Sequence, residues 1–191
     1  MNKVFFFKFF TAIVILSLTS CKNESSKKSD AKKDSMEVQD LKDLQAEHIP
    51  GVLTYMHKVT ITFAEQGRDQ IEKPEVREFL EELRKETETL ADKLSYVIKE
   101  KDWKVLDSDL SQNLIEDFDR RQEKIRSLEK GNFDSGFMRS LNEYLFDQLY
   151  VLERDLMPLA KDEREKEMIE ISMNIYKQYA DRSIEIMHSV Q

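Results

Sequence analysis

Three histidines are the side chains of this sequence best suited to bind a metal ion: His48, His57 and His188. None lies in the HExxH pattern, which places two zinc ligands on one helix face. Glu185 and His188 form a single Glu-x-x-His pair. A carboxylate-bridged di-metal bundle needs two such pairs and two further glutamates that point inward. We therefore expect Glu185 and His188 to lie on the solvated surface.

His57 is the strongest single candidate for a metal ligand, and Glu86 is the second. His57 flanks an apolar stripe one turn after Leu53, so we expect a core or boundary residue with a hydrogen-bond partner. Most glutamates of the series around Glu86 lie opposite the apolar stripe of their segment, which favours a solvated face. That series is Glu78, Glu81, Glu82, Glu86 and Glu88. Because a di-metal site needs about six inward ligands, the sequence predicts no bound metal or cofactor, with a His57 and Glu86 site as the alternative.

Composition and motifs exclude several other functions. The 191 residues carry a formal net charge of -8 and no basic stripe, which argues against nucleic-acid binding. The sequence contains no nucleophile elbow, phosphate loop or dinucleotide fingerprint. The methionines lack the repeated close spacing of a copper site, so we expect them to fill gaps in the core. We therefore expect a protein without enzymatic activity.

The only cysteine, Cys21, closes a segment that is typical of exported proteins. Lys3 and Lys8 precede an apolar run from Phe9 to Leu16, and small polar residues then lead to the cysteine. This order predicts a secretory signal peptide over residues 1–20. The apolar run is shorter than the roughly 20 residues of a membrane-spanning helix.

The residues Leu18-Thr19-Ser20-Cys21 resemble the lipobox of bacterial lipoproteins. In that family the cysteine is acylated and the chain is cut before it, so the resemblance implies a lipid on Cys21 as the membrane contact. It also implies a place in the bacterial cell envelope. Lys22 follows in place of an aspartate, and the sorting rule of that family then implies the outer membrane, at its periplasmic face or at the cell surface.

The rest of the chain divides into a tether and one domain. Residues 21–40 are rich in lysine and acidic residues and have almost no apolar side chains to bury, which predicts a disordered tether. Residues 41–191 are long enough for one domain with a real core. With 4 glycines, 3 prolines and 36% charged residues, the composition is typical of a long-helix protein.

Apolar residues recur at helical spacing throughout this domain. A short run over Leu41 to His48 is expected to end at Pro50-Gly51, and a helix is expected from Val52. Pro74 suits the first turn of the next helix, whose stripe is the strongest in the chain. That stripe is Val76, Phe79, Leu80, Leu83, Thr87, Leu90, Leu94 and Val97.

Three further helices are predicted by capping residues and periodicity. Asp107 or Ser108 is expected to begin the first, and Gly131-Asn132 to end it with a left-handed cap. Asp134 or Ser135 is expected to begin the second, which Pro158 interrupts. The last is expected from about Lys161 to Ser189, with an inward stripe of Met168, Ser172, Ile175, Tyr179, Ile186 and Val190. Long amphipathic helices with short connections predict an all-α, antiparallel four-helix bundle with extra short helices.

Two stretches resemble a family of exported bacterial proteins of unknown function, described as predicted outer membrane proteins. They are Pro74-Glu75-Val76-Arg77-Glu78-Phe79 and Phe133-Asp134-Ser135-Gly136-Phe137. The resemblance spans roughly residues 50–190 and implies a ferritin-like fold. The family carries an Asp-His pair where this chain has Glu86-Thr87, and a further histidine where it has Leu145. Both histidines are missing, so the resemblance implies the fold without the metal site.

These observations favour a lipid-anchored helical bundle with a non-enzymatic binding or envelope-structural role. Its protein or envelope partner cannot be named from the sequence. The alternative is a ferritin-like metal-binding protein.

Overall fold

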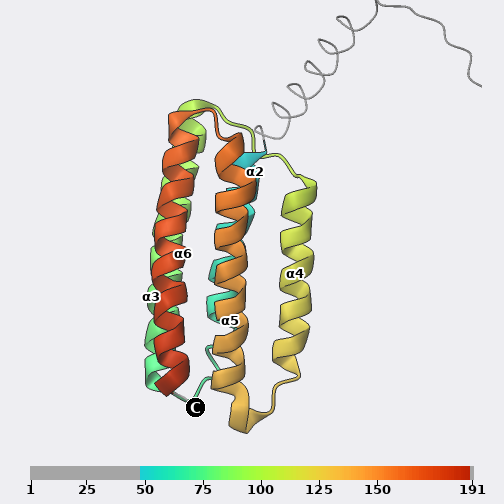
Figure 1. The fold of residues 1–191 in the computed structure, drawn as a ribbon, viewed down its shortest axis with the longest axis vertical. Coiled ribbons are helices and arrows are strands. Elements are labelled where there is room, and N and C mark those ends of the chain that lie inside the picture. The colour runs from blue at the N-terminus through green and yellow to red at the C-terminus, as the bar shows by residue number, and fades with distance from the viewer. Residues whose placement is uncertain (1–47, 190–191) are drawn as a thin grey trace, which may run out of the picture. The chain divides into compact units, whose positions relative to one another are not determined.

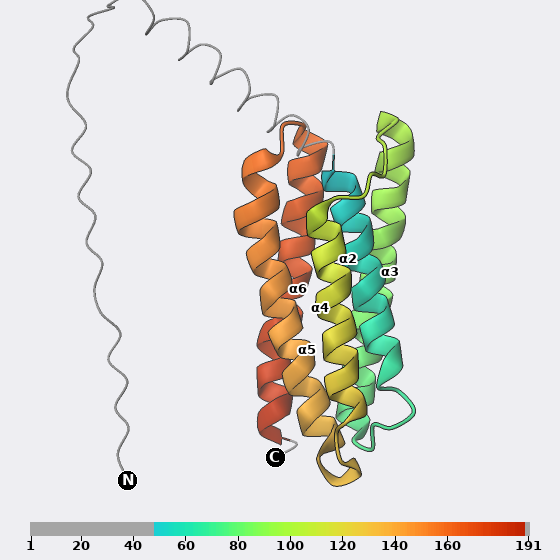
Figure 2. The ribbon, with the colours of Figure 1, turned by 90° about the vertical axis from the view of Figure 1, so that its right-hand side faces the viewer.

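A computed structural model describes residues 48–189, and all the regular secondary structure of this part is helical. The predicted all-α class is therefore confirmed for these residues. The helices lie alongside one another in a bundle (Figure 1; Figure 2). They are α2 (Ile49–Gln66), α3 (Pro74–Lys101), α4 (Asp109–Arg126), α5 (Phe133–Tyr150) and α6 (Glu163–Ser189). A π-helix (Val151–Leu156) and two 3-10 turns (Lys130–Asn132 and Met157–Leu159) complete the set.

Several sequence predictions lie outside the described residues. These are the signal peptide over residues 1–20, the acylated Cys21, the tether over 21–40 and the helical run before His48. Within the described part, no helix combines the length and the apolar character that a membrane crossing requires.

Helix α3 follows the sequence prediction most closely. Pro74 lies in its first turn, where the missing N–H costs no hydrogen bond. All eight residues of the predicted stripe are buried. The helix ends at Asp102, whose φ of 53° is left-handed, and the N–H of Trp103 then donates to the Ile98 carbonyl at 3.0 Å. Trp103 is partly buried and packs against the core.

Cross-helix contacts show how the helices hold one another. Phe63 of α2 lies 5.8 Å, 5.5 Å and 5.3 Å from the ring centroids of Phe118, Phe137 and Tyr144, so it joins α2 to α4 and α5. On α6, the Arg182 guanidinium lies 5.5 Å from the ring centroid of Phe79 on α3. Helix α4 lies at the edge of the bundle in Figure 1 and contacts α2 and α5.

The start of α2 corrects one sequence prediction. Pro50-Gly51 was expected to end a helix, but both residues lie in the first turn of α2, which begins at Ile49. Proline is tolerated there because the first N–H groups of a helix have no partner within the helix. The presence of a proline in the sequence therefore does not by itself show whether a helix begins or ends at that position.

Two predicted boundaries near α4 and α5 are also wrong. Helix α4 ends at Arg126, and Gly131 lies in the separate 3-10 turn rather than in a left-handed cap. Helix α5 begins at Phe133, one residue before the expected Asp134. Asp134 instead accepts a hydrogen bond from the backbone N–H of Lys73 at 2.7 Å, which ties this end of α5 to the start of α3. A tertiary contact thus uses the carboxylate that sequence reasoning assigned to capping.

The inward face of α6 differs from the predicted stripe. Ile175 and Ile186 are only half-buried, whereas Tyr176 and Ser183 are fully buried. Met168, Ser172 and Tyr179 are buried as expected. Val190 lies outside the described residues.

Candidate functional site

The interior of the bundle contains a layer of buried polar side chains that includes His57. His57 is fully buried on α2, and its Nε2 lies 3.1 Å from the Ser172 hydroxyl on α6. The Ser172 hydroxyl donates its one proton to the Met168 carbonyl at 2.8 Å. The bond from His57 must therefore be donated by Nε2, which leaves Nδ1 as an unprotonated acceptor. Nδ1 is buried and has no hydrogen-bond partner among the described residues.

Burial keeps the His57 imidazole neutral. Loss of hydration disfavours the charged form, and it lowers the pKa of His57 from 6.5 to about 3. The Tyr176 ring meets the imidazole edge-on at a centroid distance of 6.3 Å. His57 is thus the hydrogen-bonded core residue that the sequence indicates.

Thr60 forms the second part of the polar layer, one turn further along α2. Its hydroxyl lies 3.0 Å from the Tyr144 hydroxyl of α5 and 3.1 Å from the Tyr176 hydroxyl of α6. Burial raises the pKa of both tyrosines, so both hydroxyls keep their protons. The layer therefore joins three helices through neutral hydrogen bonds.

The positions where the family resemblance expects ligands do not form a metal centre here. Thr87 is buried, and its hydroxyl donates to the Leu83 carbonyl at 2.7 Å. Leu145 is fully buried. Glu86 is exposed on the surface of α3, whereas His57 lies in the core. No group of three or more histidine, cysteine or acidic residues within 48–189 is arranged to hold a metal ion.

The remaining sequence candidates lie on the surface. Glu185 and His188 are exposed on α6, as predicted. None of the five glutamates in the series around Glu86 is buried, and three of them take part in ion pairs. Arg84 bonds to Glu81 and lowers the pKa of that carboxyl to about 2. The acidic series is therefore a solvated face with paired charges.

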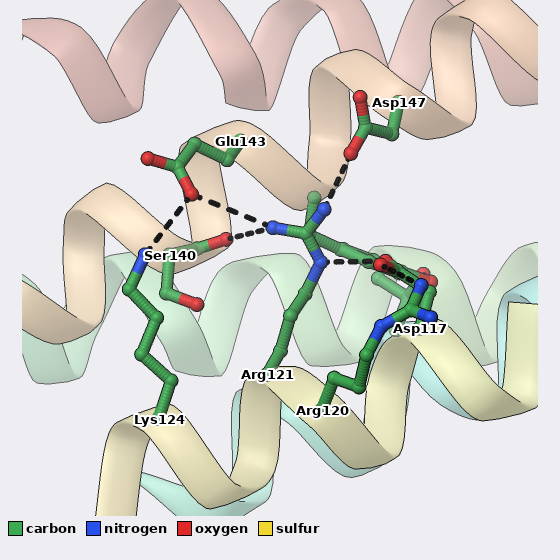
Figure 3. Close-up of polar contacts among 9 residues, drawn as sticks. Asp117, Arg120, Arg121, Lys124, Ser140, Glu143 and Asp147 are labelled. Carbon is green, nitrogen blue, oxygen red and sulfur yellow. Dashed lines mark hydrogen bonds and ion pairs between the residues drawn. The ribbon is translucent and has the colours of Figure 1, made fainter. Parts of the chain in front are cut away.

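A charged cluster between α4 and α5 was not predicted from the sequence. Figure 3 shows the Arg121 guanidinium pointing from α4 toward α5. It bonds to Asp117 at 2.6 Å and to Asp147, and it lies 3.6 Å from Glu143. Only 13% of the Arg121 side chain is exposed, although its partner carboxylates are more accessible. The cluster attaches the outer helix α4 to the rest of the bundle.

A cavity of about 600 Å³ opens at the end of the bundle where α2 begins. Its walls come from the start of α2, the start of α4 and the segment that follows α5. Val52, Leu110, Leu156 and Leu159 provide apolar surface, and Arg154 is among the charged lining residues. The volume is within the range of small-molecule sites. The π-helix that supplies Arg154 and Leu156 has a geometry often found at functional sites.

The sequence offered no direct signal for this cavity. Its lining joins residues more than 100 positions apart, such as Val52 and Leu159. Only the interruption of helical spacing at Pro158 marked this region. Comparisons of the chain with protein-family models, with curated proteins and with solved structures give no match.

Proposed function

We propose that this protein is a lipid-anchored, non-enzymatic helical bundle of the bacterial cell envelope that acts by binding or as a structural element. The anchor is supported by the resemblance of Leu18-Thr19-Ser20-Cys21 to a lipobox. The observation that favours this role over a di-metal centre is the neutral polar layer around His57 and Thr60. Its hydroxyl and imidazole groups bond to one another across α2, α5 and α6. Uncharged groups paired in this way stabilise a core, whereas a di-metal centre needs inward carboxylates.

We further propose a ferritin-type arrangement, in which α2, α3, α5 and α6 form an antiparallel four-helix core. Two ion pairs support it: Arg182 lies 2.7 Å from Glu82, and Lys93 lies 2.9 Å from Glu167. From Glu82 to Lys93 the residue number rises along α3, while the paired residue on α6 changes from Arg182 to Glu167. Antiparallel neighbouring helices form pairs in this order. Helix α4 stands in the connection between α3 and α5, where ferritin-type bundles have one long crossover.

A metal-binding role is the second candidate, and one observation favours it. The unprotonated Nδ1 of His57 is a buried lone pair with no partner among the described residues. Such a nitrogen is a common metal ligand. The nearby inward positions offer hydroxyls and leucines in place of carboxylates, so a divalent ion there would carry uncompensated charge in a buried site.

The anchoring part of the proposal is tested at Cys21. Replacing Cys21 with serine removes the only thiol, so the chain should lose its lipid. It should then move from the detergent phase to the aqueous phase, or accumulate as the uncut precursor. Ser25→Ala, a change in the same tether, is the matched control and should partition as the unsubstituted protein does. Unchanged processing and detergent partition in Cys21→Ser would refute the lipid anchor.

Metal analysis of the purified protein separates the two candidate functions. The proposal expects less than about 0.2 equivalents of iron, manganese, copper or zinc, because the inward ligand set of a di-metal site is missing. A chelator should leave the melting temperature unchanged, since a ligand that binds only the folded state raises apparent stability. Near-stoichiometric metal that disappears in His57→Ala would establish the metal-binding role instead.

A further inference from the structure

The end cavity has an apolar wall that suits the body of a small organic molecule. Val52 and Leu156 are each only 2% exposed, so this part of the wall belongs to the core of the bundle. Leu110 and Leu159 continue the wall as half-buried side chains. Small-molecule sites are lined mostly by apolar side chains, with a few polar groups that fix the orientation of the ligand. A ligand of this cavity is therefore expected to have an apolar body.

Charged side chains line the same cavity, and most of them are acidic. The described lining residues include the carboxylates of Asp107, Asp109 and Asp155 and the guanidinium of Arg154. Three negative charges thus lie around the cavity with one positive charge. A cleft lined by an excess of one sign of charge raises the local concentration of ligands of the opposite sign. The cavity therefore favours a cation over an anion.

Two of the three carboxylates have no competing partner in the described part of the chain. The side chains of Asp109 and Asp155 make no hydrogen bond or ion pair with another described residue. Asp107 differs, because its carboxylate accepts a hydrogen bond from the Tyr55 hydroxyl at 2.7 Å. Ser108 already caps α4 by accepting a hydrogen bond from the Ser111 N–H, so the cap does not use Asp109. Asp109 and Asp155 are thus available as acceptors for a cationic group.

We propose that the end cavity binds an organic ammonium ion with an apolar body. The ammonium N–H groups donate to the carboxylates of Asp109 and Asp155, and the apolar body lies against Val52 and Leu156. Hydrogen bonds between ionised groups are stronger than those between neutral groups. Such a ligand would give a chemical content to the binding role proposed above. The cavity does not depend on the lipid anchor, so a negative result here would leave the test at Cys21 unaffected.

Three probes with the same alkyl chain test the charge preference: octylamine, octanol and octanoate are cationic, neutral and anionic at neutral pH. They are titrated by calorimetry into the full chain with Cys21→Ser, so that no acyl chain on the protein can compete. Octylamine should bind about tenfold more tightly than octanol, the value of a hydrogen bond to a charged group, and octanoate should bind most weakly. Equal binding of octylamine and octanol would overturn the proposal, and so would the absence of octylamine binding.

The length of the amine tests the apolar wall. Each methylene removed, from octylamine through hexylamine to butylamine, should weaken binding by up to about fourfold, because less apolar surface is buried. Affinity that does not change with chain length would show that the amine binds only to exposed carboxylates, and the cavity would then not be the site.

Asp155→Asn locates the site, because it removes one carboxylate of the cavity and keeps the size of the side chain. Octylamine binding should weaken about tenfold, and octanol binding should not change. Asp109→Asn tests the second carboxylate in the same way. The matched control is Asp119→Asn, which removes the same charge from an exposed position of α4 outside the cavity and should change neither affinity. If the control weakens octylamine binding as much as Asp155→Asn does, the amine responds only to net charge and the proposal is wrong.

Discussion

The Nε2 of His57 on α2 donates a hydrogen bond to the Ser172 hydroxyl on α6 at a distance of 3.1 Å. This bond joins two residues that are 115 positions apart in the chain. It fixes the tautomer of a fully buried imidazole, and burial keeps that imidazole neutral in the folded protein. The unfolded chain has no such constraint, so the two states bind protons differently in mildly acidic solution.

Acid should destabilise the fold through His57. Burial lowers the pKa of His57 from 6.5 to about 3. As the pH falls below about 6.5, the unfolded state gains a proton that the folded state does not. This difference removes about 1.4 kcal/mol of stability per pH unit. His57→Gln keeps a donor for Ser172 and should remove this part of the slope, measured by urea unfolding from about pH 6 to about pH 4.

The control for this measurement is His188→Gln, which changes an exposed histidine on α6. It should retain the slope of the unsubstituted protein. If His57→Gln retains that slope as well, then His57 is protonated in the folded state and its placement in a neutral layer is wrong.

Gln148 is a second buried polar residue that affects stability. It is 1% exposed on α5, and its Oε1 has no hydrogen-bond partner among the described residues. Burying an unpaired acceptor costs free energy, so Gln148→Met should raise the free energy of unfolding by about 1 kcal/mol. Gln178→Met, at an exposed position of α6, should change it by less than about 0.5 kcal/mol. A clear loss of stability in Gln148→Met would show that Oε1 has a partner, such as an ordered water.

The sequence predicts the buried face of α3 better than the buried face of α6, and this difference has a physical cause. In α3 the inward positions are almost all apolar and the others almost all polar, so only one face can be buried. Helix α6 carries further apolar residues, such as Ile171 and Met173, outside its buried face. Its orientation depends on the hydrogen bonds that Ser172 and Tyr176 make to α2. Those partners are identified only once the fold brings the two helices together.

The candidate sites also include features that local sequence spacing can predict and features that depend on contacts between helices. His57 could be selected as a buried histidine from its place beside an apolar stripe. Its partner Ser172 could not be selected, because local spacing says nothing about which helices are neighbours. The Arg121 cluster and the end cavity each join several elements. Sequence periodicity describes one helix at a time, so it cannot reveal such sites.

Arg121 should contribute more to stability than its sequence neighbour Arg120. Arg121→Ala leaves Asp117 and Asp147 without a shared cation and should cost about 2 kcal/mol, the range for hydrogen bonds to charged groups. Arg120 is 71% exposed and pairs with Asp117, which is itself partly exposed, so Arg120→Ala should cost less than about 0.5 kcal/mol. Urea unfolding gives both values. Hydrogen exchange should show faster opening of α4 in Arg121→Ala alone, and equal protection in both variants would contradict the proposed attachment of α4.

Two glycines should respond in opposite ways to replacement by alanine. A Cβ on Gly51 would lie 2.1 Å from the Leu106 carbonyl oxygen, so the backbone must move apart. Gly51→Ala should therefore cost about 1–3 kcal/mol, as overpacking does. A Cβ on Gly131 meets nothing within 4 Å, and no described glycine has a positive φ. Gly131→Ala should stabilise the fold by up to about 1 kcal/mol, because it restricts the unfolded chain. Thermal and urea unfolding of the two variants measure this contrast, and equal effects would mean that the α3–α4 connection does not lie against the start of α2.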